Sequence, residues 1–193
     1  MELKLDLENK ISLVTGAGQG IGEGIARTLA QQGSKVIVVD INDQSAKKVA
    51  QDINNLFPNS ASSFQADLTD TGEIESMIEF SLSTFNKIDC ICNNAAASKG
   101  IGPVENYKLE EVQATLDMTF ISLWKCVQAE IKFLKRQSIP ASIVNISSNS
   151  AIKGYAFNSI YAASKAAVNN LTQSIAKEVA RNNIRVNAVS PGT

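Results

Sequence analysis

Short apolar runs and longer amphipathic segments alternate along this chain. The short runs are rich in β-branched residues, as buried strands of a parallel sheet are, and they cover residues 11–15, 35–40, 62–67, 87–93, 142–147 and 184–190. The segments between them carry apolar residues at the spacing of an amphipathic helix, in stripes that begin at Ile21, Ala46, Ile74, Val112 and Ala163. The pattern predicts strands and helices in strict alternation.

Such alternation is typical of βαβ units, whose right-handed crossovers build one parallel sheet with helices on both faces. We therefore expect an α/β fold with a Rossmann-like, doubly wound sheet of six strands, in a single domain over residues 1–193. Ligands of these sheets bind at the carboxyl ends of the strands, so functional residues are expected in the loops that follow the strands.

Composition narrows the chemistry because the chain has no histidine. This excludes Ser-His-Asp and Cys-His catalysis and histidine-ligated zinc. The three cysteines, Cys90, Cys92 and Cys126, are too few for a site of four thiolates. We expect them to be small buried side chains and expect no metal site. Acid–base chemistry must then come from tyrosine, lysine or a carboxylate.

Charge and hydropathy argue against several partners. The formal net charge is −1 and the 18 basic residues are spread along the chain, whereas nucleic-acid binding needs a basic stripe. No apolar run approaches the length of a membrane span, and the first ten residues lack the apolar block of a signal peptide. The cytoplasm is the expected location.

The turn after the first predicted strand is rich in glycine and opens the first predicted helix. It does not have G-x-G-x-x-G spacing, yet it offers a tight turn and backbone N–H groups at a helix start, which together suit a pyrophosphate. The residues expected to contact such a ligand are Gly16, Gly18, Gln19, Gly20, Ile21 and Gly22. An ordinary flexible loop is the alternative, and the position between strand and helix argues against it.

Asp40 ends the second predicted strand. An acid at this position accepts hydrogen bonds from the adenosine ribose hydroxyls and repels a 2′-phosphate. Gln19 supplies no compensating positive charge, so NAD is favoured over NADP. The alternative role, an acid at the entry to the next helix, fits less well after the apolar residues 36–39.

Further motifs follow in order: Asp67-Leu68, Asn93-Asn94-Ala95-Ala96, Ser148, Tyr161-Ala-Ala-Ser-Lys165 and Asn187 to Gly192. With the glycine-rich turn they resemble the classical short-chain dehydrogenases/reductases over essentially the whole chain, although Ala96 stands where that family usually has glycine. The resemblance implies that Asp67 and Leu68 hold the adenine, that Asn94 contributes to the cofactor site, and that Pro191 and Gly192 lie beside the nicotinamide.

The tyrosine and lysine also suggest chemistry on their own. Residues four apart on a helix share a face, so Tyr161 and Lys165 are expected to point toward one cleft. A neighbouring ammonium and an oxidised nicotinamide both favour a phenolate and would lower the pKa of Tyr161. Ser148 would hydrogen-bond the substrate oxygen, and the resemblance adds that Lys165 binds the nicotinamide ribose.

Two features depart from the family pattern. Thr119 stands where the family usually has an asparagine that holds a water in the proton relay, so it is a weaker candidate site residue. The sequence ends at Thr193, and the family's substrate lid and last strand are not part of it. Because the lid largely sets the substrate, the sequence is nearly silent on substrate identity.

The sequence thus predicts an oxidoreductase that transfers hydride between NAD(H) and a secondary alcohol or ketone. The alternatives are a dinucleotide-binding protein without turnover and a structural subunit. Trp124 and Phe133 fall off the stripe of the long helix that should face the sheet, which favours an interface. We expect a homodimer through the long helices over residues 109–137 and 161–181, and a tetramer only if the family's C-terminal segment is present.

Overall fold

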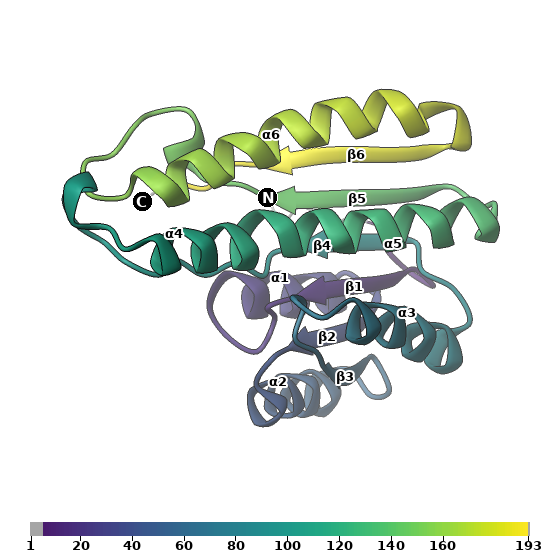
Figure 1. Cartoon of the computed structure of the whole chain (residues 1–193). Coiled ribbons are helices and arrows are strands. Elements are labelled where there is room, and N and C mark those ends of the chain that lie inside the picture. Colours follow the sequence, from purple (N-terminus) through teal and green to yellow (C-terminus); the bar gives the residue numbers. More distant parts are fainter. Residues whose placement is uncertain (1–5, 193) are drawn as a thin grey trace.

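Six parallel strands form one sheet in the computed structural model, which describes residues 6–192. Their order across the sheet is β3-β2-β1-β4-β5-β6, which is a doubly wound arrangement (Figure 1). The strands are β1 (Ile11–Thr15), β2 (Lys35–Asp40), β3 (Ala61–Gln65), β4 (Cys90–Asn93), β5 (Ala141–Ile146) and β6 (Ile184–Val189). Residues 1–5 and 193, which complete the predicted domain range, lie outside the described residues.

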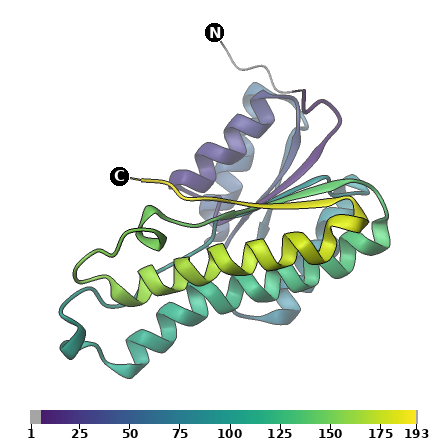
Figure 2. The same cartoon turned by 90° about the horizontal axis from the view of Figure 1, so that it is seen from above.

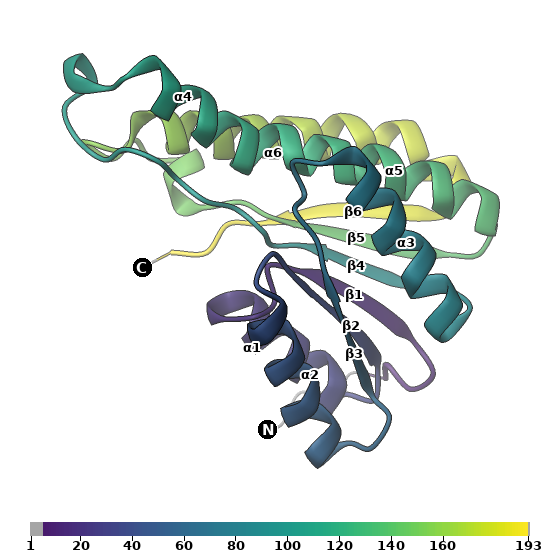
Figure 3. The same ribbon diagram turned by 60° about the horizontal axis from the view of Figure 1, so that its bottom comes forward.

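Helices cover both faces of the sheet (Figure 3). They are α1 (Gly20–Gln31), α2 (Asp43–Leu56), α3 (Thr71–Phe85), α4 (Leu109–Leu116), α5 (Ser122–Gln137) and α6 (Ser159–Val179). One hydrophobic core lies between the sheet and α1 and α2, and a larger one lies between the sheet and α3, α5 and α6. The predicted fold class is confirmed.

The predicted bounds of β1 and β2 are confirmed, β5 begins and ends one residue earlier than predicted, β6 ends one residue earlier, and β3 and β4 need a larger correction. β3 ends at Gln65, because the carboxylate of Asp67 accepts hydrogen bonds from Thr69 and forms a turn. β4 begins only at Cys90, because the backbone N–H and C=O of Ile88 both bond the side chain of Gln137 instead of a neighbouring strand.

The predicted long helix is a helical run interrupted by a π turn. Residues Asp117–Ile121 between α4 and α5 have π geometry, and Thr119 is fully buried within them. A π turn inserts one residue without ending the helix and is frequent at functional sites. The apolar spacing of the sequence could not show this extra residue.

Two buried faces differ from the predicted stripes. Phe133 is 7% exposed and belongs to the larger core, so the expectation that it leaves the sheet-facing stripe is wrong, whereas Trp124 is 42% exposed as expected. The buried face of α6 runs through Lys165 and Thr172 rather than through alanines. Thr172 can be buried there because its hydroxyl donates to the carbonyl of Val168.

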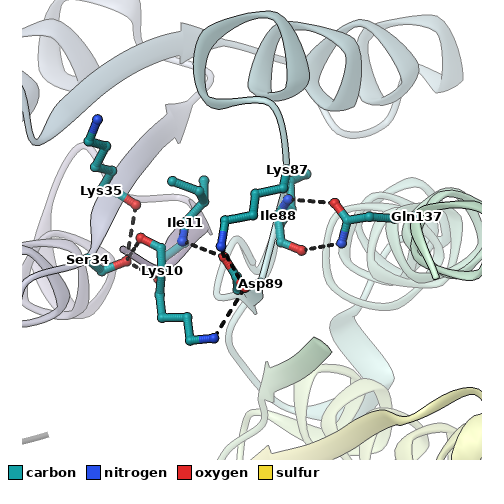
Figure 4. A network of polar contacts seen from close by, with 9 residues as sticks. Lys10, Ile11, Ser34, Lys35, Lys87, Ile88, Asp89 and Gln137 are labelled. Atoms are coloured by element: carbon teal, nitrogen blue, oxygen red, sulfur yellow. Dashed lines mark hydrogen bonds and ion pairs between the residues drawn. The ribbon is translucent and has the colours of Figure 1, made fainter. Parts of the chain in front are cut away.

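Polar side chains tie the strands together at the amino edge of the sheet, where the strands begin (Figure 4). The buried carboxylate of Asp89 accepts from the N–H of Ile11 at 2.9 Å and pairs with the ammonium groups of Lys10 and Lys87. Nearby, the hydroxyls of Ser12 and Ser34 lie 2.7 Å apart, and Ser34 also donates to carbonyl oxygens. This network joins β1, β2 and the residues before β4.

One face of β6 has no described element packed on it. The strand buries Ile184 and Val186 but exposes Arg185, Asn187 and Val189. Figure 2 shows β6 beside α6, which covers the opposite face.

None of the helices in residues 6–192 is long and apolar enough to cross a membrane. In the same residues no group of three histidine, cysteine or acidic side chains could hold a metal ion.

Candidate active site

The glycine-rich turn joins β1 to α1 at the carboxyl edge of the sheet. Gly16 has a φ of +61°, and a Cβ there would lie 2.8 Å from the Cα of Ala95. At Gly18 a Cβ would lie 2.9 Å from the Cγ of Asp40. The first turn of α1 contains Gly20, Ile21 and Gly22, whose N–H groups have no intrahelical acceptor, as in every helix. These N–H groups and the close backbone make the turn suitable for a phosphate.

Asn94 holds this turn in place. Its Nδ2 donates to the carbonyl oxygens of Thr15 at 3.1 Å and Gly16 at 3.0 Å. The hydroxyl of Thr15 in turn accepts from the N–H groups of Asn94 and Ala95. Asn94 was expected to belong to the cofactor site, and these contacts give its side chain the task of shaping the turn.

Asp40 lies across the glycine turn at the end of β2. Its Oδ2 accepts from the N–H of Gly18 at 2.9 Å, and its Oδ1 accepts from the N–H of Asn42 at 2.9 Å. Both oxygens keep lone pairs for hydroxyl donors. Among the described residues that line this cleft, Lys165 is the only basic one. Arg27, the nearest arginine along the chain, is held by Glu23 and Asp52.

Asp67 and Leu68 follow β3 and line the same cleft. Hydrogen bonds from the N–H and the hydroxyl of Thr69 lower the pKa of Asp67. Lys125 of α5 donates to the carbonyl of Thr69 at 2.6 Å and so fixes the loop from the other side. Sequence reasoning missed Lys125, because nothing in its neighbourhood on α5 indicates a contact 56 residues away.

The cleft that these elements enclose has a volume of about 470 Å³. The predicted site residues in its wall are Gly16, Gln19, Ile21, Asp40, Asp67, Leu68, Asn94, Tyr161 and Lys165. The other predicted site residues are not among those that form the wall: Gly18, Gly20, Gly22, Thr119, Ser148, Pro191 and Gly192. Pro191 nevertheless lies near Ser148 in space, because its carbonyl accepts from the N–H of Asn149 at 2.8 Å, and Asn149 follows Ser148 directly.

Tyr161 and Lys165 face the cleft from one side of α6, as the spacing predicts. Lys165 is 2% exposed, its Nζ donates to the carbonyl of Ile146 at 2.7 Å, and burial lowers its pKa to about 8. The ammonium lies 5.7 Å from the ring centre of Tyr161.

The pKa of Tyr161 differs from the expectation. Burial raises the pKa of the phenol, and a hydrogen bond with Ser148 opposes that rise. The expectation that the ammonium of Lys165 lowers this pKa is wrong for the chain by itself, because Lys165 does not contribute to the shift and is committed to the carbonyl of Ile146. Ser148 is therefore the group that acts on the phenol.

Thr119 uses its hydroxyl within the π turn. Its Oγ1 donates to the carbonyl of Ala97 at 2.6 Å, which ties the helix to the loop after β4. The hydroxyl has one proton, so it can only accept from a water while this bond is made.

A family model described as short chain dehydrogenase matches residues 10–193. The chain belongs to the short-chain dehydrogenase family. It is thus an oxidoreductase of a nucleotide-binding family with a Rossmann fold, and the resemblance drawn from its motifs is confirmed.

Curated relatives include proteins with and without a stated activity. The chain is 33% identical over 186 residues to an uncharacterized oxidoreductase of Staphylococcus epidermidis, which covers 96% of this chain and 78% of the relative. It is 34% identical over 187 residues to a 3α-hydroxysteroid dehydrogenase of Mediterraneibacter gnavus, which covers 96% of this chain and 74% of the relative.

Solved structures of short-chain dehydrogenases share this fold closely. A 3-ketoacyl-(acyl-carrier-protein) reductase from Brucella melitensis complexed with NADH matches with a TM-score of 0.91 and 30% identity, over 96% of this chain and 76% of that one. A short chain dehydrogenase from Mycobacterium smegmatis matches with a TM-score of 0.93 and 29% identity, over 97% of this chain and 78% of that one.

Proposed function

We propose that this short-chain dehydrogenase transfers hydride between NAD(H) and a secondary alcohol or ketone through Ser148, Tyr161 and Lys165. The observation that carries the proposal is the arrangement around Tyr161: it lines the cleft with the buried Lys165, whose ammonium lies 5.7 Å from its ring centre, and Ser148 acts to lower the pKa of its phenol. Neither histidine nor a metal cluster competes with this group for acid–base chemistry in the described chain.

The described residues fit a dinucleotide. Gly16 and Gly18 let the turn pack closely against Ala95 and Asp40, and a Cβ at Gly20 would meet no protein atom within 4 Å, so the start of α1 is open to a pyrophosphate. Asp40 offers carboxylate lone pairs at the place expected for the adenosine ribose, and Asp67 and Leu68 line the wall beyond it. Lys165 would hold the ribose of the nicotinamide half, with Pro191 and Gly192 beside the ring.

The side chains divide the proton chemistry among them. When bound, the nicotinamide supplies the hydride donor or acceptor. Tyr161 gives its phenolic proton to a ketone oxygen, or takes the proton of an alcohol in the reverse direction. Ser148 hydrogen-bonds the same oxygen and orients it toward the phenol. Lys165 takes no part in these proton steps while its ammonium donates to the carbonyl of Ile146; its proposed task is to hold the nicotinamide ribose.

The proposed preference is for NAD over NADP. A 2′-phosphate would lie against the carboxylate of Asp40, and among the described residues no basic side chain other than Lys165 lines the cleft to compensate. The NADH in the Brucella melitensis structure supports a cofactor of this class.

Two measurements on the purified chain test this function. NADH fluorescence titration should give saturable binding, and a panel of steroid 3-ketones, 3-ketoacyl thioesters and cyclic ketones should contain at least one compound that oxidises NADH. Binding without turnover over the whole panel would favour a non-catalytic dinucleotide-binding protein. Absence of both would favour a structural subunit.

The non-catalytic alternative has one observation in its favour. Thr119 replaces the family's usual asparagine and spends its single hydroxyl proton on the carbonyl of Ala97. Thr119→Asn separates the two functions: a chain limited by the relay gains turnover with unchanged NADH affinity, whereas a non-catalytic chain stays inactive.

We also propose a homodimer through α4, α5 and α6. Trp124 on α5 is 42% exposed, and exposed apolar patches of this kind are typical of interfaces. Sedimentation velocity should give a dimer for the unmodified chain and a monomer for Trp124→Glu. A clean monomer of the unmodified chain at micromolar concentration would contradict the dimer.

The three cysteines are free, which fits the proposed cytoplasmic location.

A further inference from the structure

Ser148 has a close neighbour that the proposed chemistry does not use. The hydroxyl oxygens of Ser148 and Ser150 lie 2.6 Å apart, and the N–H of Ser150 donates to the Oγ of Ser148 at 3.2 Å. Ser148 precedes a single turn of helix, Asn149–Ala151, which brings the two side chains together. Ser150 is 8% exposed, so its hydroxyl has little access to water.

Counting protons decides which hydroxyl donates. A serine hydroxyl has one proton and two lone pairs. Among the described residues, the hydroxyl of Ser150 has no acceptor other than the Oγ of Ser148. If Ser148 donated to Ser150, the proton of Ser150 would be buried without a partner, which is costly. Ser150 is therefore the donor.

The direction of this bond determines what Ser148 can do. With both lone pairs taken by the N–H and the O–H of Ser150, Ser148 can act only as a donor. Its proton is then free for the oxygen of a substrate or of Tyr161, whose pKa Ser148 acts to lower. A free serine rotor would instead sample orientations in which its proton points elsewhere.

We propose that Ser150 is a positioning residue that fixes the hydroxyl proton of Ser148 toward the reacting oxygen. This role rests on the proposed function of Ser148 and Tyr161. Ser150 does not touch the substrate; it acts by saturating the lone pairs of Ser148. The other titratable groups of the cleft wall, Asp40, Asp67 and Lys165, make no hydrogen bond with Ser150.

The test follows Tyr161 itself, so that it does not depend on finding the substrate. The chain has three tyrosines, and replacing them with 3-fluorotyrosine gives one fluorine resonance for each. Tyr161→Phe assigns the resonance, and Tyr107 serves as an internal reference. Ser150→Ala should raise the pKa of Tyr161 by about 0.5 to 1, the effect of weakening one hydrogen bond. Ser150→Thr, which keeps the hydroxyl, should restore it.

A matched control is present at the other edge of the sheet. Ser34→Ala removes one hydroxyl from the buried pair Ser12 and Ser34, whose oxygens lie 2.7 Å apart. This variant should lose stability and leave the titration of Tyr161 unchanged. An unchanged titration in Ser150→Ala would overturn the role of Ser150, and so would an equal shift in Ser34→Ala.

Turnover separates this inference from the proposed function. With any ketone that the unmodified chain reduces, Ser150→Ala should lower kcat by about three- to tenfold, the rate equivalent of a pKa shift of about 0.5 to 1, with little change in the affinity for NADH. If the unmodified chain reduces no ketone of the panel, hydride transfer fails as a function, and the titration of Tyr161 still decides the role of Ser150.

Discussion

The two edges of the sheet use the same kinds of residue for opposite purposes. At the amino edge, Ser12 and Ser34 form a buried hydroxyl pair, and Asp89 holds two lysine ammonium groups and a backbone N–H. At the carboxyl edge, Ser148 and Ser150 form an equally close pair beside a buried lysine. Residue type alone does not distinguish the two edges.

The two edges differ in whether their polar groups bond only other protein groups or keep donors and lone pairs for a ligand. At the amino edge it is spent inside the protein: Ser34 bonds Ser12 and two carbonyls, and Gln137 bonds both polar groups of Ile88 (Figure 4). At the carboxyl edge the groups are equally fixed, but Tyr161 and Asp40 line the cleft with hydrogen-bonding capacity to spare, and Ser148 keeps its hydroxyl proton. Polar groups that are held rigidly and still have an unused hydrogen-bond donor or lone pair therefore distinguish the functional edge.

The largest expected effect is at Tyr161. Tyr161→Phe removes the proton-carrying oxygen and should lower kcat by about 100- to 10,000-fold, the usual contribution of general acid–base catalysis. NADH fluorescence titration should give nearly the same affinity, because the ring remains. Substantial turnover in this variant would remove the phenol from the mechanism and erase the distinction between the edges.

Replacing Asp89 at the amino edge should lower stability and leave the functional site unchanged. Asp89→Ala removes the acceptor of the Ile11 N–H and leaves two lysines near it unpaired. We expect the free energy of unfolding, measured by urea denaturation, to fall by about 1 to 3 kcal/mol, mostly because the buried N–H of Ile11 loses its acceptor, while the half-exposed lysines contribute little. NADH affinity per folded molecule should not change. A selective loss of cofactor binding would show that the amino edge communicates with the site.

Glu130 on α5 lies in the core, and it tests whether the comparison of used and unused hydrogen-bonding groups also applies there. It is fully buried, and its Oε2 accepts from the Nδ2 of Asn93 at 3.0 Å. Among the described residues, the Oε1 of Glu130 and the Oδ1 of Asn93 are both buried without a partner. A proton on Glu130 would remove the unpaired charge from this buried carboxyl group. Burial raises the pKa of Glu130 from 4.5 to about 7, which favours that proton.

This assignment predicts a pH dependence of stability. Between pH 4.5 and about 7 the folded chain keeps the proton that the unfolded chain has lost, so stability falls as the pH rises through this range. The loss amounts to about 3 kcal/mol at most. Glu130→Gln, whose amide does not titrate and whose oxygen can still accept from Asn93, should remove this contribution. The lowered pKa of Lys165, about 8, acts at higher pH and does not interfere. An unchanged pH profile in Glu130→Gln would contradict the protonated acid.

The sequence predicts the carboxyl edge of the sheet, with its cofactor side, much better than the polar contacts of the core and the amino edge. The β-branched runs and the glycine turn locate the strands and the cofactor side, because local composition determines both. The contacts of the buried Glu130 and the half-buried Gln137 could not be predicted, since their partners Asn93 and Ile88 lie 37 and 49 residues away. Ser150 had a local signal, a second serine two positions after Ser148. Its role follows only from burial, which a sequence does not show.

The smallest expected effect concerns the choice of cofactor. Asp40→Ser combined with Ile41→Arg removes the carboxylate and places a cation on a residue that lines the cleft. The ratio of NADP to NAD affinity should rise by about 10- to 100-fold, since hydrogen bonds to charged groups contribute about 1.5 to 3 kcal/mol each. Asp43→Ser with the same arginine is the matched control, because Asp43 pairs with Lys47 on α2. The unmodified chain should bind NAD more tightly than NADP. If it prefers NADP, the carboxylate of Asp40 serves only the N–H groups of Gly18 and Asn42, and its capacity is spent inside the protein like that of Asp89.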